Sequence, residues 1–304
     1  MTGSSSKINQ QSALATASVI DGRVADSLPL NDRGGAYGHG LFETMLLHKS
    51  LLPLRKQHSE RLRRDAPTLG ISITAEQLAQ NIDCLMKLLD PQQLSSGIIK
   101  VTVTAGSGGR GYASPAAEVA QPRIAVQYFA LPETAQLQLQ RQEGIRVTSC
   151  DYRLPLNPAL AGIKHLNRLD QVMARAEWAE EYDDGIMFSA HGSAIETTRA
   201  NLFIKLASGW VTPGLDQAGV RGVMRELLLD QLFSRAGLKV EQGEVSPEQL
   251  DSAEELFCCS SVRGIVPIVA IGKGAADLAV GEDTRALQSE LESALQDHSG
   301  AFSC

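Results

Sequence analysis

The sequence predicts a two-domain protein of the α+β (mixed α/β) class. Its 304 residues suggest roughly two domains at about 150 residues each. Strand-like runs rich in β-branched residues alternate with segments in which apolar residues follow helical spacing. A polar stretch at 131–143 separates two such groups. We therefore expect a flexible leader over 1–18, a smaller N-terminal α/β domain over 19–130, a linker over 131–143 and a larger C-terminal domain over 144–304.

In the first domain the pattern predicts strands at 42–48, 51–54, 98–104 and 123–129, and helices at 58–69 and 75–89. The second helix places Leu78, Ile82, Leu85 and Leu89 on one face, and Pro91 stops it. A glycine-rich loop at 106–112 follows the strand at 98–104.

In the second domain we expect strands near 145–149, 185–188, 200–205, 210–212, 256–259 and 266–270. Helices are predicted at 166–180, from Gly222 to Ala236, and at 284–295. Leu169, Val172, Met173 and Ala176 form the apolar stripe of the first of these helices.

Composition excludes several classes of function. A net charge of −7 is unsuited to broad contact with nucleic-acid phosphates. The five cysteines form no CxxC pair and the histidines no metal-ligand spacing, which argues against a disulfide framework or a metal site and favours free thiols in a reducing cytoplasm. No apolar run approaches the ~18 residues of a membrane-spanning helix, and the N-terminus lacks the apolar core of a signal peptide.

The glycine-rich loop does not fit a nucleotide site. It lacks the Gly-Lys-Ser/Thr of a Walker loop, and no amphipathic helix follows it, as a dinucleotide loop would require. Two interpretations stay open: a long β-turn, or a loop that presents Arg110 to an anionic substrate.

Four other features, each taken alone, allow both a structural and a functional interpretation. Lys164 precedes a helix, where a lysine is usually solvated, but small and apolar neighbours could desolvate it for nucleophilic or base chemistry. Glu196 and Arg61 could be surface charges, and the glycines at 219–222 a simple turn. Together, an amine, a carboxylate for a pyridinium nitrogen and a helix start for phosphate are the parts of a site for pyridoxal 5′-phosphate (PLP).

Longer segments carry a family resemblance: 31–44 (NDRGGAYGHGLFET), 106–112 (GSGGRGY), 157–169 (NPALAGIKHLNRL) and 215–222 (LDQAGVRG), with Glu196 five residues before Asn201. Over 19–272 the chain resembles the fold type IV PLP enzymes, whose fold is that of D-amino acid aminotransferase. That family contains branched-chain and D-amino acid aminotransferases and aminodeoxychorismate lyases. The resemblance is strongest to the lyases.

The resemblance implies roles for individual residues. Lys164 would bind PLP covalently and then transfer protons, and Thr44 would lie near the reacting carbons. Glu196 would pair with the pyridine nitrogen. The phosphate would be held by Arg61, the backbone N–H groups of Val220 and Arg221, and the Ser261 hydroxyl.

The implied reaction is a β-elimination that converts 4-amino-4-deoxychorismate to 4-aminobenzoate and pyruvate, a step of folate biosynthesis. Arg110, then Lys100, then Arg168 are the cations expected to face the two substrate carboxylates. The resemblance also implies a homodimer. The alternative is an aminotransferase of the same fold, acting on a branched-chain or D-amino acid. Arg199, His39 and Gly35 depart from the family pattern.

Overall fold

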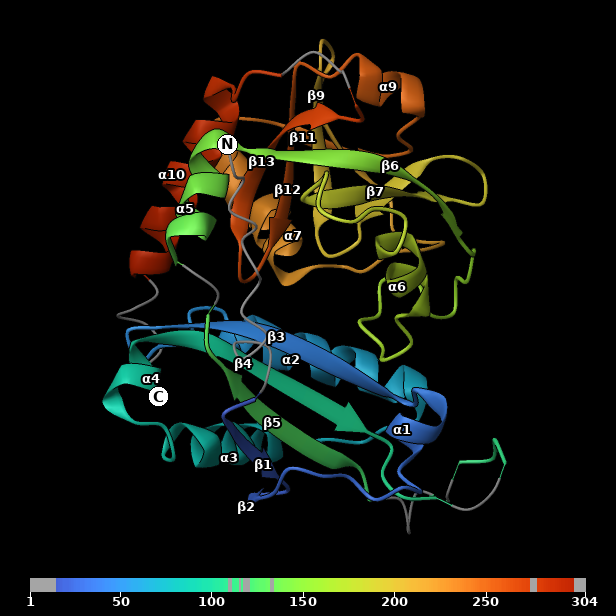
Figure 1. The fold of residues 1–304 in the computed structure, drawn as a ribbon, viewed down its shortest axis with the longest axis vertical. Coiled ribbons are helices and arrows are strands. Elements are labelled where there is room, and N and C mark those ends of the chain that lie inside the picture. The colour runs from blue at the N-terminus through green and yellow to red at the C-terminus, as the bar shows by residue number, and fades with distance from the viewer. Residues whose placement is uncertain are drawn as a thin grey trace, which may run out of the picture. The chain divides into compact units, whose positions relative to one another are not determined.

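The computed structural model describes residues 15–108, 111–114, 116, 121–131, 134–273 and 278–297. It divides into two compact units, residues 1–134 (unit 1) and 135–304 (unit 2). The division falls within the predicted linker, and helix α5 (Thr134–Glu143) occupies most of that segment. Helices and strands are mixed in both units (Figure 1), which confirms the α+β class.

Unit 1 is built on an antiparallel sheet in the order β2-β1-β5-β4-β3. Its strands are β1 (Ala17–Ile20), β2 (Arg23–Val24), β3 (Gly40–His48), β4 (Ser96–Thr104) and β5 (Arg123–Phe129). Its helices are α1 (Arg33–Tyr37), α2 (Arg55–Asp65), the 3₁₀ helix η2 (Ala66–Leu69), α3 (Ala75–Met86) and α4 (Pro91–Ser95). Residues alternate along β3 and β4, so that Leu41, Met45, Ile99 and Val101 are buried on one face.

Unit 2 contains a larger mixed sheet in the order β11-β10-β9-β12-β13-β6-β7-β8. An additional β8–β9 pairing closes β9, β12, β13, β6, β7 and β8 into a ring. The strands are β6 (Ile145–Leu154), β7 (Asp184–Ser189), β8 (Ala194–Thr197), β9 (Asn201–Leu206), β10 (Gly209–Pro213), β11 (Val240–Gly243), β12 (Glu255–Ser260) and β13 (Gly264–Ile271). Ile186, Leu202, Cys258 and Val266 belong to its buried core, which explains the near-continuous apolar runs of these strands.

The remaining helices of unit 2 are α6 (Leu169–Arg175), α7 (Val223–Leu227), the π-helical turn η3 (Leu228–Leu232), α8 (Phe233–Arg235), α9 (Pro247–Asp251) and α10 (Glu282–Asp297). α7, η3 and α8 follow one another without interruption, as the predicted helix ending near Ala236 requires. Gly237 ends it in a left-handed conformation with φ 71°.

Three expectations about elements are wrong. Residues 51–54 form no strand: Leu51 makes a single bridge with His48, Pro53 has no N–H to continue a ladder, and α2 begins at Arg55. β1 takes in Ala17 and Ser18, the last two residues of the predicted leader. The helix predicted over 166–180 is limited to Leu169–Arg175, the bounds of α6.

The apolar stripe of α6 is also not a core face. Leu169 is 75% exposed, Val172 59% and Met173 54%, whereas Ala174 is fully buried. Helical periodicity identified an apolar face, but a period alone does not tell which neighbour covers it. Four short strands, β1, β2, β8 and β11, were not predicted because each has four residues or fewer.

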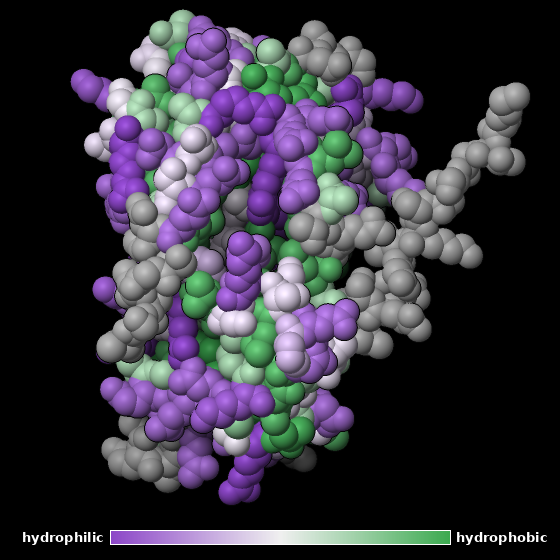
Figure 2. Space-filling view, turned by 90° about the vertical axis from the view of Figure 1, so that its left-hand side faces the viewer, coloured by the Kyte–Doolittle hydropathy of each residue, from purple (hydrophilic) through white to green (hydrophobic). Residues whose placement is uncertain are grey.

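Within the described part of the chain, no helix is long and apolar enough to cross a membrane. Nor does that part hold any group of three or more His, Cys, Asp or Glu side chains that could bind a metal ion. On the face drawn in Figure 2, hydrophilic residues surround smaller apolar areas, as on most globular surfaces.

Candidate cofactor site

Backbone pairing places the Lys164 segment against the Val220 segment in unit 2. Gly162 and Val220 form a parallel bridge: the Gly162 N–H donates to the Gly219 carbonyl and the Arg221 N–H to the Gly162 carbonyl, both at 2.9 Å. Gly162 and Gly219 have φ of 80° and 86°, a left-handed conformation that favours glycine. The half-buried Lys164 follows two residues after this bridge.

Glu196, on strand β8, lies beside the Val220 segment. Its side chain is only 5% exposed. Oε2 accepts the Val220 N–H at 2.9 Å, and Oε1 accepts a longer bond from Gln171 Nε2 at 3.4 Å. Asn201, its cross-strand partner on β9, donates from Nδ2 to the Val220 carbonyl at 2.8 Å. The structure therefore brings a buried carboxylate to the segment that pairs beside Lys164.

The charge state of Glu196 depends on its neighbours. Burial raises its pKa above the ordinary value, while the positive charges of Arg168 and Lys164 and the Val220 N–H act in the opposite direction. The pKa remains raised on balance. A carboxylate in this setting is stabilised by any further positive or N–H⁺ group placed against it.

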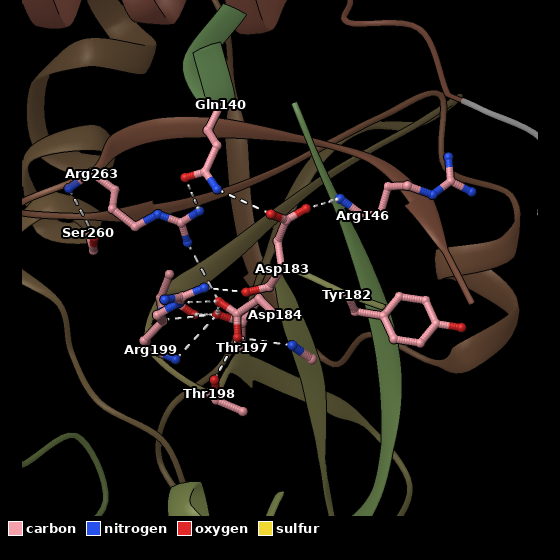
Figure 3. A network of polar contacts seen from close by, with 12 residues as sticks. Gln140, Arg146, Tyr182, Asp183, Asp184, Thr197, Thr198, Arg199, Ser260 and Arg263 are labelled. Atoms are coloured by element: carbon pink, nitrogen blue, oxygen red, sulfur yellow. Dashed lines mark hydrogen bonds and ion pairs between the residues drawn. The ribbon is translucent and has the colours of Figure 1, made fainter. Parts of the chain in front are cut away.

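A second buried carboxylate, Asp184 on β7, fixes the end of β8 (Figure 3). It accepts hydrogen bonds from the Thr197 and Thr198 hydroxyls at 2.9 and 2.6 Å, and from Arg199 Nε at 3.1 Å. Arg263, in the turn between β12 and β13, lies 3.7 Å from it. Because Thr197 follows Glu196 directly, this network holds the strand that carries Glu196. It also gives Arg199, a departure from the family pattern, a structural partner.

The backbone N–H groups of Val220 and Arg221, predicted to bind the phosphate, have partners inside the protein. The Val220 N–H donates to Glu196, and the Arg221 N–H donates to the Gly162 carbonyl across the bridge. The first N–H groups of the helix that begins at Val223 have no intrahelical acceptor and lie next in the chain. Ser261 lies in the β12–β13 turn.

Thr44 and Lys100 lie in unit 1 and are brought together there. They are directly paired across β3 and β4, on the half-buried face of the sheet. The Lys100 ammonium lies 5.7 Å from the ring centroid of Phe42 on the same face. A hydroxyl and a cation are thus neighbours on one surface of unit 1.

Arg61 is also in unit 1, on α2, and it is 4% exposed. Its Nε and Nη2 donate to the two oxygens of Glu43 at 2.7 and 2.5 Å, and His58 Nδ1 lies 2.6 Å from Glu43 Oε2. Burial alone would raise the pKa of Glu43, but the charges and hydrogen bonds of Arg61 and His58 outweigh it and lower the pKa to about 2. Arg61 is therefore held rigidly by an ionised partner.

Arg110 lies outside the described residues. The loop beyond it, from Gly111 to Ala113, is held by Arg33, which is 3% exposed. The Arg33 guanidinium donates to the carbonyls of Gly111, Tyr112 and Ala113 at 3.2, 2.9 and 3.2 Å. Its Nε donates to His39 Nδ1 at 3.1 Å, so His39, which departs from the family pattern, serves here as an acceptor.

The donor set beside Lys164 suits PLP. It offers an amine for the aldehyde and a buried carboxylate for the pyridine nitrogen. Two buried polar atoms near it, His165 Nδ1 and Gln171 Oε1, have no hydrogen-bond partner among the described residues. Buried polar atoms are normally paired, so these atoms are consistent with a polar group bound there. Gln171 and Asp184 were not predicted, because a single Gln or Asp carries no motif.

Residues 40–271 match the family described as Amino-transferase class IV. An aminodeoxychorismate lyase of Vibrio harveyi is 33% identical over 90% of this chain and 98% of its own. The crystal structure of 4-amino-4-deoxychorismate lyase from Pseudomonas aeruginosa is 38% identical, with a TM-score of 0.81 over 91% of this chain and 98% of that one. A putative branched-chain-amino-acid aminotransferase of Methanocaldococcus jannaschii is 28% identical, over 86% and 88%. These similarities confirm the resemblance to fold type IV enzymes.

Proposed function

Because the chain belongs to the class IV aminotransferase family, we propose that it is a PLP-dependent aminodeoxychorismate lyase. It would convert 4-amino-4-deoxychorismate to 4-aminobenzoate and pyruvate. The observation that carries the PLP site is the buried Glu196 tied to the segment paired beside Lys164. The choice of a lyase is supported by the similarity, over nearly the whole chain, to the lyases of Vibrio harveyi and Pseudomonas aeruginosa.

In this proposal Lys164 binds the cofactor covalently and Glu196 faces its pyridine nitrogen. The phosphate is assigned to the start of the helix at Val223, to the Ser261 hydroxyl and to Arg61. When bound, PLP supplies an electron sink for a carbanion next to the substrate nitrogen. Glu196 contributes by staying ionised, since its negative charge favours a protonated pyridine nitrogen.

The chain's own residues then move protons. The Lys164 amine takes the proton from the amine-bearing ring carbon of the substrate, which requires that the amine be neutral. The neighbouring C–O bond breaks, pyruvate leaves and the ring becomes aromatic. Thr44, together with Lys164, supplies the proton that the departing enolpyruvyl group needs. Lys100, which is paired with Thr44 on the sheet, and Arg110 are assigned to the substrate carboxylates.

The second candidate is an aminotransferase, favoured by the 28% identity to the putative branched-chain enzyme of Methanocaldococcus jannaschii. It would use the same Lys164 and Glu196 but would transfer the amino group to a keto acid. The two candidates differ in their products, not in their cofactor.

We also propose that the enzyme is a homodimer, as the resemblance implies. Sedimentation velocity of the purified chain tests this directly. A mass near twice the 32.6 kDa of one chain supports the dimer, and a monomer at micromolar concentration contradicts it.

The function is tested by product formation from 4-amino-4-deoxychorismate generated in situ. Wild-type protein with PLP should release 4-aminobenzoate and pyruvate in equal amounts, and Lys164→Ala should release neither. The exposed Lys239, replaced in Lys239→Ala, is the matched control and should behave as wild type. PLP uptake without either product, but with keto-acid formation from an amino-acid donor, would identify an aminotransferase instead.

A further inference from the structure

The Arg168 side chain donates hydrogen bonds to the backbone on both sides of Lys164. Its Nε donates to the carbonyl of His165 at 2.9 Å, and its Nη2 to the carbonyl of Ile163 at 3.4 Å. These are the residues that follow and precede Lys164. The guanidinium therefore fixes the loop from which the Lys164 side chain extends.

These contacts use the Nε–Nη2 edge of the guanidinium. That edge is one of the two through which arginine binds a carboxylate side-on with two parallel hydrogen bonds. Since carbonyls of the Lys164 loop already occupy it, this edge of Arg168 is not available to a substrate carboxylate.

The charge of Arg168 also acts on the groups around Lys164. It is the first of the charges that lower the pKa of Glu196 against the effect of burial. Burial, and then the charge of Arg168, lower the pKa of the adjacent His165 to about 4. Arg168 thus favours an ionised Glu196 and a neutral His165. Its positive charge is held beside the Lys164 loop by two hydrogen bonds, and a positive charge disfavours a second one placed close to it.

We propose that Arg168 is a positioning residue for Lys164, which orients the loop through two carbonyls and favours the neutral amine, rather than a ligand of the substrate. The inference rests on the PLP part of the proposed function. It does not depend on whether the enzyme is a lyase or an aminotransferase, because both need the same lysine.

The test compares Arg168→Gln and Arg168→Lys with wild type, all loaded with PLP. The first readout is the pH midpoint of the visible absorption of the bound cofactor, which reports the protonation of the nitrogen of Lys164. We expect Arg168→Gln to raise this midpoint by about one pH unit, because a neighbouring positive charge is lost. Arg168→Lys keeps the charge and should keep the midpoint near that of wild type.

The second readout is the split between kcat and KM for 4-amino-4-deoxychorismate. Both variants lose the paired guanidinium hydrogen bonds to the carbonyls of His165 and Ile163. We therefore expect kcat to fall about 10- to 100-fold while KM stays within about threefold. Arg175→Gln is the matched control, since Arg175 is the last residue of α6, which Arg168 precedes, and it also binds two carbonyls, those of Trp178 and Ala179. It should shift neither the midpoint nor kcat.

A tenfold rise in KM with an unchanged midpoint and kcat would overturn the inference, because it would identify a substrate ligand. An equal midpoint shift in Arg175→Gln would overturn it too, since the effect would then be general. If wild type binds PLP but yields no 4-aminobenzoate, the lyase function fails, while the midpoint comparison still decides the role of Arg168.

Discussion

Glu196 shows how a single buried side chain can be tested apart from the fold. Glu196→Gln keeps the size of the side chain and can still accept the Val220 N–H, but it removes the negative charge. We expect PLP to be taken up through Lys164 and the rate of 4-aminobenzoate formation to fall at least about 100-fold, equivalent to roughly 2.7 kcal/mol in the barrier. Steady-state kinetics on PLP-saturated protein measure this. A rate within threefold of wild type would show that Glu196 does not support the cofactor.

The buried carboxylate of Glu43 should make the free energy of unfolding depend on pH. Its pKa is lowered from 4.5 to about 2 in the folded protein, so its stabilising effect is complete above about pH 4.5 and is lost as the pH falls toward 2. The difference corresponds to about 3 kcal/mol. Urea unfolding between pH 6 and 3 should therefore show a steeper loss of the free energy of unfolding in wild type than in Glu43→Gln. Parallel curves for the two proteins would contradict this.

At the scale of elements, the turn after β3 is strained in a way that can be relieved. Lys49 and Ser50 both have positive φ, 49° and 64°, where a side chain costs roughly 1 kcal/mol. We expect Ser50→Gly to raise the free energy of unfolding by about 0.5–1 kcal/mol, measured by urea denaturation. The exposed helical residue Ser234 is the control, because the same substitution there should lower stability by a similar amount. A lower free energy of unfolding in Ser50→Gly than in wild type would contradict the prediction.

The elements also show what could be foreseen from the sequence. β3, β4 and β5 were predicted nearly to their ends because Ile99, Val101 and Val103 alternate with less apolar neighbours, a pattern that local chemistry alone produces. The missed features all depend on long-range pairing. The Arg221 N–H donates to Gly162 across the bridge, the Val220 N–H donates to Glu196, and the exposed stripe of α6 depends on its neighbours.

The candidate site follows the same division. Lys164, Glu196 and the segment around Val220 were identified through the resemblance, and unit 2 does bring them together. The roles of Asp184 and Gln171 could not be predicted, because isolated polar residues acquire meaning only from the partners that folding gives them.

For the whole molecule, cofactor binding should appear as stability. A group that binds only the folded chain stabilises it by about 2.7 kcal/mol at a concentration one hundred times its Kd. We expect PLP to raise the Tm of wild type by several degrees in thermal unfolding followed by circular dichroism. Lys164→Ala, which lacks the covalent attachment, should show a much smaller rise. Equal shifts in both proteins would place PLP binding elsewhere.

The hydrogen bonds from Arg33 to the carbonyls of residues 111–113 have a consequence for how this enzyme can change over evolution. In this loop Arg33 binds carbonyl oxygens, which every amino acid supplies, and the Tyr112 side chain is 86% exposed, with its ring centroid 5.5 Å from that of Tyr37. The path of the loop is thus encoded in part at a distance, in Arg33, which binds three successive carbonyls of the loop. Substitutions at Tyr112 and Ala113 therefore keep the backbone hydrogen bonds to Arg33, so the side chains of the loop can change while its backbone conformation is retained.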